Sequence, residues 1–156
     1  MKQLYKSKRE EGFTIIEVLI VLAIAGLIIL IVFLAVPALQ RNSRNTQRKN
    51  AVSSIGGALG EYVNNHNGQL PGDNAKFQSD VLTNTKSKYF DTVTYSSVAA
   101  ADNQQSTDTN SVTVYKGTKC NSAGDAATLS GASSRSVAAL YAVESGGGTQ
   151  SQCQEL

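Results

Sequence analysis

A single carboxylate, that of Glu17, lies near the start of a long apolar run, and its chemistry needs an explanation. Within residues 15–39, only Glu17, Gly26 and Pro37 interrupt bulky apolar residues and alanine, and the next charge along the chain is Arg41. An ionised carboxylate in hydrocarbon costs on the order of a few kcal/mol unless it lies near lipid headgroups or meets a cation. Glu17 therefore either lies close to the headgroups in the first turns of a helix, favoured by the helix dipole, or pairs with an amine.

No other residues have the types and spacing of an enzyme site. His66 is the only histidine and lies at a predicted helix end, where we expect a solvated capping role rather than that of a base. Gly146, Gly147 and Gly148 follow a strand-like run but precede no helix and no lysine, so they predict a turn rather than a phosphate cradle. Four aspartates are scattered over predicted loops without the spacing of a calcium loop: Asp73, Asp102, Asp108 and Asp125. We therefore expect neither an enzyme nor a bound metal or cofactor.

The apolar run is long enough to cross a membrane. As a helix, residues 15–39 extend over roughly 37 Å, whereas the hydrocarbon core of a bilayer is about 30 Å thick. The run is too long for the apolar part of an ordinary secretory signal, and no small-residue cleavage site follows it. A basic arm mixed with two acids precedes it: Lys2, Lys6, Lys8, Arg9, Glu10 and Glu11. We therefore predict a membrane helix that the protein keeps.

The junction between this arm and the apolar run resembles the leader junction of type IV prepilins and pseudopilins. The residues that carry the resemblance are Gly12-Phe13-Thr14-Ile15-Ile16-Glu17-Val18-Leu19. The resemblance implies that a membrane aspartyl peptidase removes residues 1–12 by cutting after Gly12, and that the new terminal residue, Phe13, is N-methylated. It covers about residues 8–39. The chain departs from the family in Glu11, where leaders often carry Lys or Arg, and in Pro37, which lies a few residues later than is usual.

The resemblance also gives Glu17 a partner. Cleavage after Gly12 leaves a cationic amine on Phe13, and this amine can neutralise the Glu17 of a neighbouring subunit when the helices pack. Such a pair would set the axial register between subunits, with Thr14 as part of the same assembly motif. Gly26 and Pro37 are the weak points of the helix, because Pro37 removes a backbone hydrogen bond. In the family, the segment between such residues can lose helicity inside a filament.

Residues 40–66 are predicted to continue the helix with an apolar stripe. Val52, Ile55, Leu59, Tyr62 and Val63 recur at steps of three and four residues. An Asn67-Gly68 pair then predicts the helix end, and Pro71 follows it. Before the stripe, residues 41–49 carry a basic collar of Arg41, Arg44, Arg48 and Lys49. The collar is either a solvated group at the membrane surface or a patch that contacts DNA.

Residues 67–156 are predicted to form a small β-rich head domain. Strand-like runs cover residues 92–99, 111–116, 136–144 and 150–154, and a short helix is predicted over 75–83. The polar segment 103–110 predicts a hairpin between the first two strands. With a membrane signal in front, Cys120 and Cys153 predict a disulfide. The expected fold class is α+β: one long helix, apolar over 13–39 and amphipathic over 40–66, packed against an antiparallel sheet of three or four strands.

The predicted function is that of a type IV pilin. As the resemblance implies, the precursor is inserted in the cytoplasmic membrane with its N-terminus inside, and is cut by the prepilin peptidase. An assembly platform and an ATPase then move it into an extracellular homopolymer for adhesion to a host surface, twitching motility or DNA uptake. Two alternatives remain open: a pseudopilin of a type II secretion system or a minor pilin, and a membrane-anchored DNA-uptake receptor that never polymerises. The formal net charge of +2 comes from residues 1–12, so the cut chain would be neutral and gives no general argument for DNA binding.

Overall fold

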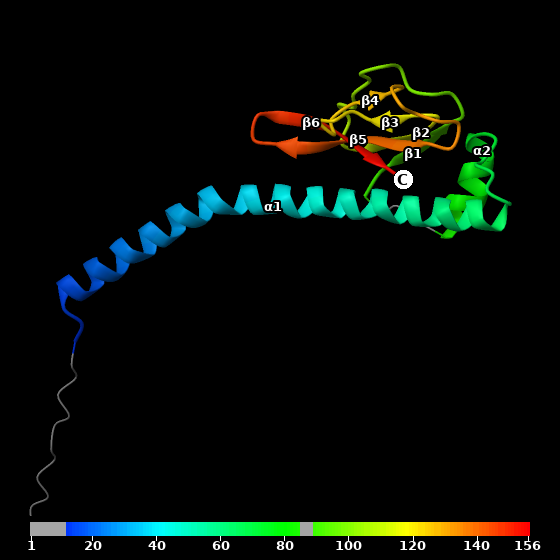
Figure 1. The fold of residues 1–156 in the computed structure, drawn as a ribbon. Helices are drawn as coiled ribbons and strands as arrows, with labels where there is room; N and C mark the ends of the chain where they lie inside the picture. Colours follow the sequence, from blue (N-terminus) through cyan, green and yellow to red (C-terminus); the bar gives the residue numbers. More distant parts are fainter. Residues whose placement is uncertain (1–11, 85–88) are drawn as a thin grey trace, which may run out of the picture. The chain divides into compact units, whose positions relative to one another are not determined.

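The computed structural model describes residues 12–84 and 89–156, so most of the expected leader lies outside the described residues. The chain divides after Leu39 into two units. The first unit holds the apolar part of the helix α1 (Ile15–Asn65), and the second holds the rest of α1 together with the sheet (Figure 1). The long N-terminal helix and the small sheet confirm the predicted α+β class.

In the second unit, α1 buries one stripe of side chains against the sheet. Val52, Ile55, Leu59 and Tyr62 are buried, and Val63 is partly buried, as their spacing predicts. The helix ends where expected, because Asn67 and Gly68 take positive φ angles of 55° and 78°. This turn lets the N–H of Gly68 donate to the carbonyl oxygen of Val63 at 2.8 Å, which satisfies a carbonyl at the helix end.

Three short helical turns replace the single short helix predicted over residues 75–83. They are α2 (Asn74–Lys76), the π turn η1 (Phe77–Val81) and the 3₁₀ turn η2 (Leu82–Asn84). Asp73 caps the first turn by accepting the N–H of Lys76 at 2.8 Å. Phe77 and Val81 are buried in the core between α1 and the sheet, and the ring of Phe77 stacks on Tyr95.

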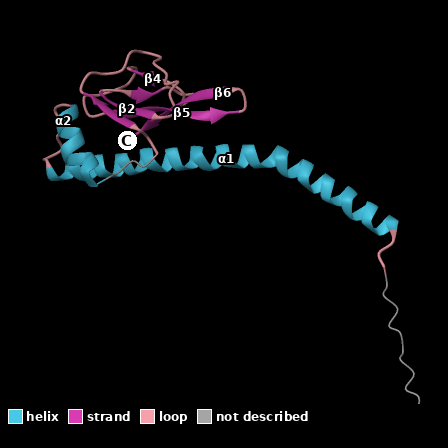
Figure 2. Ribbon diagram, turned by 180° about the vertical axis from the view of Figure 1, so that it is seen from behind, coloured by secondary structure: helices cyan, strands magenta, loops and turns pink. Residues whose placement is uncertain are grey.

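The main sheet has four strands in the order β1-β2-β5-β6, and a second sheet pairs β3 with β4. The strands are β1 (Thr92–Ser96), β2 (Ser111–Lys116), β3 (Lys119–Cys120), β4 (Ala127–Thr128), β5 (Val137–Ser145) and β6 (Gly148–Glu155). The pairs β2–β5 and β5–β6 are antiparallel. One face of the main sheet lies on α1, while loops and the β3–β4 pair lie over its other face (Figure 2).

The central strand β5 is buried on both faces, which explains its unbroken apolar sequence. Val137, Ala139, Tyr141 and Val143 belong to the core beneath the sheet, together with the α1 stripe. Leu140 belongs to a second cluster on the other face, together with Ala100 and Ala127, and the partly buried Cys153 packs against this cluster. A strand covered on both sides cannot alternate between apolar and polar residues.

The predicted hairpin between the first two strands is wrong, because β1 and β2 are parallel. Their register pairs Thr92 with Ser111 and Ser96 with Tyr115. The connection 97–110 crosses the outer face of the sheet, where it bonds to β4: the N–H of Asn103 donates to Ala127 O at 2.8 Å, and the N–H of Ala127 donates to Gln104 O at 2.9 Å. The connection is therefore a covering layer, and the polar character of residues 103–110 does not reflect a tight turn.

A hairpin does join β5 to β6, through the glycine run that predicts a turn. Gly148 has a φ of 142°, in a region that residues with side chains rarely adopt. The expected disulfide is present and joins Cys120 of β3 to Cys153 of β6. It ties the small second sheet to the last strand of the main sheet.

Removing this disulfide should destabilise the head. A crosslink that closes a loop over 33 positions contributes about 3–4 kcal/mol on the chain-entropy model. We expect the Cys120→Ala/Cys153→Ala chain to unfold at a lower denaturant concentration by about that free energy. The measurement is chemical unfolding of the full chain in detergent, followed by near-ultraviolet circular dichroism. Equal stability of the variant and the parent would contradict the prediction.

Candidate processing and assembly site

The predicted cleavage junction lies outside regular structure and is accessible. Gly12, Phe13 and Thr14 precede the first residue of α1, and all three are exposed. The Phe13 side chain is 84% exposed. A peptidase must bind its substrate in an extended form, so a non-helical peptide bond between Gly12 and Phe13 suits cleavage there.

Thr14 begins α1 as its N-cap. Its side-chain oxygen accepts the N–H of Glu17 at 3.3 Å, and its carbonyl oxygen accepts the N–H of Val18 at 3.3 Å. Thr and Glu three residues apart before an apolar run are the sequence signal of a capping box, which is a local signal that could have predicted this cap. The cap fixes the position of Glu17 in the first turn of α1, where the positive end of the helix dipole favours a carboxylate.

The rest of the first unit exposes its apolar side chains. No residue is buried in the most hydrophobic 18-residue window of α1. By its length and composition, this part of α1 could cross a membrane. Gly26 and Pro37 both lie inside the continuous helix. The loss of helicity expected between them concerns packed subunits, and it stays a prediction.

In the second unit, two arginines of the basic collar bind one carboxylate of the sheet. The Nε of Arg44 donates to both carboxylate oxygens of Glu144, at 2.9 and 3.1 Å, and its Nη2 forms an ion pair with the same group. The Nη1 of Arg48 lies 2.9 Å from Glu144 Oε1. Arg48 is buried, at 7% exposure. We call Arg44, Asn45, Arg48 and Glu144 the carboxylate clamp.

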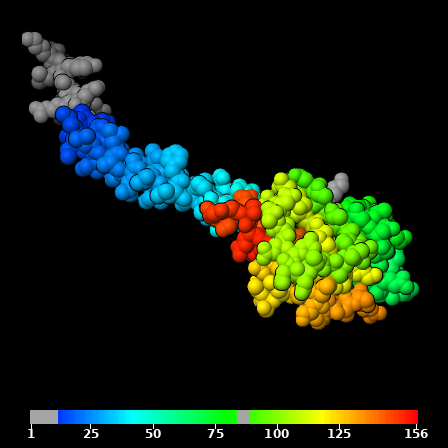
Figure 3. Space-filling model, turned by 90° about the horizontal axis from the view of Figure 1, so that it is seen from above, coloured from blue at the N-terminus to red at the C-terminus, as the bar shows by residue number. Residues whose placement is uncertain are grey.

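Asn45 completes the clamp by binding the backbone of the same residue. Its amide nitrogen donates to the carbonyl oxygen of Glu144 at 2.7 Å, and its amide oxygen accepts the N–H of Glu144 at 2.8 Å. Glu144 lies beyond the pairing of β5 with β2, whose register ends at Tyr141 and Val112. The side chain of Asn45 therefore satisfies strand groups that β2 does not reach. Figure 3 shows the end of the hairpin, in red and orange, beside the cyan part of α1.

The clamp corrects the interpretation of the collar. Arg48 is buried, and Arg44, although exposed, is bound with it to Glu144, so neither guanidinium is a free cation for DNA phosphates. Lys49 is exposed and Arg41 half-buried, and neither forms an ion pair with the described residues. Glu144 was missed because it lies 96 and 100 positions from its partners, so no local signal connects them.

The electrostatics of the clamp favour the ionised carboxylate. The hydrogen bond from Arg44, with a further one from Arg48, lowers the pKa of Glu144 to about 2. The same contact raises the pKa of Arg44. Glu144 therefore keeps its charge over the whole neutral and mildly acidic range.

The scattered acids and the histidine have local structural roles. The ring of His66 stacks on Tyr62, with its Nδ1 2.8 Å from the Tyr62 carbonyl oxygen. Asp102 accepts from Thr128 and from the N–H of Leu129. Within residues 12–84 and 89–156, no three His, Cys, Asp or Glu side chains gather in a group that could hold a metal ion.

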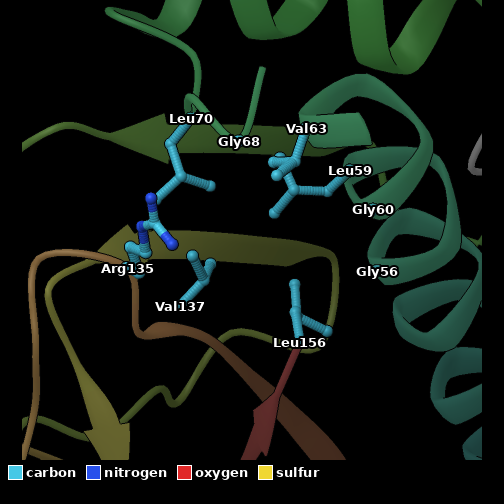
Figure 4. Close-up of a pocket in the computed structure, with 9 residues that line it drawn as sticks. All are labelled: Gly56, Leu59, Gly60, Val63, Gly68, Leu70, Arg135, Val137 and Leu156. Carbon is cyan, nitrogen blue, oxygen red and sulfur yellow. The ribbon is translucent and has the colours of Figure 1, made fainter. Parts of the chain in front are cut away.

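One apolar hollow lies between α1 and the sheet, with a volume of about 220 Å³. Gly56 and Gly60 open it on the helix side, and Arg135 points into its mouth (Figure 4). A Cβ on Gly56 would lie 2.9 Å from the side chain of Leu156, which packs there instead. Glycine at this position therefore lets the last residue of the sequence rest against α1.

The comparison with protein families identifies the junction. Residues 7–33 match the family model described as the prokaryotic N-terminal methylation motif. The chain carries the signal peptide of type IV pilins and pseudopilins. This motif implies processing by a prepilin peptidase and points to a structural protein, a pilin-like or pseudopilin precursor. Together with the apolar start of α1, it fits a precursor anchored in a membrane. A search of curated proteins finds no match, and neither does a search of solved structures.

Neutralising Glu144 should weaken the contact between the sheet and α1. Glu144→Gln removes the charge that balances the buried Arg48, and we expect a loss of roughly 2 kcal/mol in unfolding free energy at neutral pH. Glu61→Gln, on an exposed helix face, is the matched control and should change the stability little.

The pH dependence gives a second measurement of the same contact. Because the folded-state pKa of Glu144 is lowered to about 2, its contribution is complete above the ordinary carboxyl pKa of about 4.5. It is lost as the pH falls from about 4.5 to about 2. The parent chain should lose stability in this window more steeply than Glu144→Gln. Parallel pH profiles of the two chains would contradict the role of the clamp.

Proposed function

We propose that this chain is a type IV pilin, a structural subunit that polymerises through its apolar helix into an extracellular filament. The observation that carries the proposal is an exposed apolar helix with the methylation motif at its start. In lipid this surface is compatible with its surroundings. Outside lipid it must be covered by other apolar surface, and identical helices of other subunits provide it.

The proposed functional segments follow from this assignment. Residues 1–12 form the leader, 13–39 the membrane and filament-core segment, 40–66 the half-helix that carries the head, and 67–156 the head. Gly12 and Phe13 form the cleavage site, and Phe13 is the site of N-methylation. The precursor waits in the cytoplasmic membrane with its N-terminus inside, and an assembly platform with its ATPase extracts it.

The proposed assembly chemistry pairs the Phe13 amine with the Glu17 carboxylate of a neighbour. The cap on Thr14 supports this role, because it holds Glu17 in the first turn, close to where the new amine forms. A carboxylate moved into an apolar filament core without a cation would be costly. Pairing removes most of that cost and favours one axial register over its alternatives.

The geometry of the clamp lends no support to a DNA-uptake receptor based on the collar. Two of its four cations already bind Glu144 within the chain. Phosphate binding through the remaining two would release few counterions and would be weak at physiological salt.

The mass of protein sheared from cell surfaces tests the proposal. We expect the mass of residues 13–156 plus one methyl group and less the two hydrogens lost in the disulfide. This single measurement would support cleavage, methylation and release from the membrane together. A full-length mass found only in membranes would contradict the proposal and favour a membrane-anchored domain that does not polymerise.

Glu17→Gln tests the assembly chemistry without changing the size of the side chain. We expect the variant to be cut and methylated, since Gly12 and Phe13 are intact, but to give at least about tenfold fewer fibres because the amine loses its partner. Electron microscopy and the mass of the membrane-bound chain are the two readouts. Unchanged fibre yield with normal processing would refute the pairing.

A further inference from the structure

Part of the face of α1 opposite the buried stripe is left uncovered within the described part of the second unit. Ser54, Gly57 and Asn64 are exposed along it. At its border with the sheet, Ser53 accepts a hydrogen bond from Gln154 of β6 at 3.0 Å, and Gly60 lines the apolar hollow. A Cβ built on Gly57 meets no atom within 4 Å. The face is small, polar and smooth, so another chain can approach it closely.

Two opposite charges flank this face. Lys49 and Glu61 are both exposed and form no ion pair with the described residues. Twelve positions separate them, which places them about 120° apart around the helix axis. The stripe of Val52, Ile55 and Leu59 runs between them on the buried side. The two charges therefore lie on opposite flanks of α1 and cannot reach each other within one chain.

The acidic flank contains a hollow that suits a cationic side chain. Glu61 and Asp80 line a space of about 340 Å³, together with the small residues Gly57 and Ala58 and the rings of Tyr62 and His66. Asp80 lies 3.8 Å from Lys76 of the same chain, a loose contact at an exposed site. The carboxylate of Glu61 has no such cation. The hollow thus has an excess of negative charge and room for a side chain.

The basic flank is complementary in charge. Lys49 lines a hollow of about 250 Å³ whose other polar residues are uncharged. They are Asn42, Asn45, Thr46, Gln150 and Gln152. Glu144, the nearby acid, is already bound by Arg44 and Arg48. The clamp therefore leaves Lys49 as a cation without a competing acid on its own flank.

We infer that Lys49 of one copy of this chain docks in the Glu61–Asp80 hollow of another copy. An open-ended polymer needs two different surfaces that fit each other, because a surface that fits only itself closes into a dimer. The two flanks of α1 meet that requirement. The inference rests on the proposed function, since it specifies a contact within the filament.

The spacing along α1 predicts the offset of the two copies. Twelve residues of helix rise about 18 Å, so the copy that contributes Lys49 is displaced by about that distance towards the C-terminal end of its neighbour's α1. The four residues from Phe13 to Glu17 correspond to only about 6 Å. The two contacts therefore join different pairs of neighbours, as is expected in a helical array where each subunit touches several others.

Charge reversal tests the contact in the full chain in its own cells. Lys49→Glu and Glu61→Lys each place like charges at the junction, and each should lower the yield of sheared fibres about tenfold. The double variant restores opposite charges and should return to within about twofold of the parent. Lys49→Arg and Glu61→Asp, which keep the charges, should assemble normally.

Crosslinking gives an independent readout. Thr46→Cys/Ser54→Cys chains, which keep Lys49 and Glu61 and carry one cysteine in each hollow, should give a ladder of multimers with a short bismaleimide, whereas each single cysteine variant gives dimers at most. Single reversals without effect, a double variant that stays defective, or the absence of a ladder would each overturn the contact. If the parent chain forms no fibres, the proposed function fails and the contact fails with it.

Discussion

The surface of residues 13–39 is the constraint on which this protein depends. Large apolar side chains are exposed around the whole helix there, from Phe13 to Leu39. The hydrophobic effect does not permit such a surface to stay in water, so its partner must be lipid or other protein. The carboxylate of Glu17 lies at one end of this segment. Both in lipid and in a protein core, its free energy depends strongly on whether it is paired with a cation.

In the second unit, a small sheet packs on the helix although the chain has few aromatic residues. It does so with one buried stripe on α1, the buried rings of Phe77, Phe90 and Tyr95, and a central strand covered on both faces. The carboxylate clamp adds specificity at the edge of this contact. A buried Arg48 tolerates only an arrangement that keeps Glu144 against it, so sliding of the hairpin along α1 would leave a charge unpaired.

The clamp also determines which charges remain for other partners. Of the four cations in residues 41–49, two are used inside the chain. A basic cluster in a sequence therefore does not by itself indicate a surface for nucleic acid. Its meaning depends on which acids the fold brings to it, and here Glu144 lies almost a hundred positions away.

The sequence by itself determined the features that arise from neighbouring residues. The cleavage junction, the lone Glu17, the stripe from Val52 to Tyr62 and the helix end at Asn67-Gly68 all depend on spacing within a few residues. Strand positions such as Ser111–Lys116 followed from residue types for the same reason. The Thr14 cap was equally local, and its capping-box spacing could have predicted it.

Only the tertiary structure decided the parallel pairing of β1 with β2 and the binding of Glu144 by Arg44 and Arg48. Both depend on where a distant segment packs. The polar loop 97–110 crosses the sheet because Ala100 and the β4 backbone hold it there, an arrangement that no local pattern records. Local propensities are summed over neighbours along the chain, whereas packing and ion pairing are settled among neighbours in space.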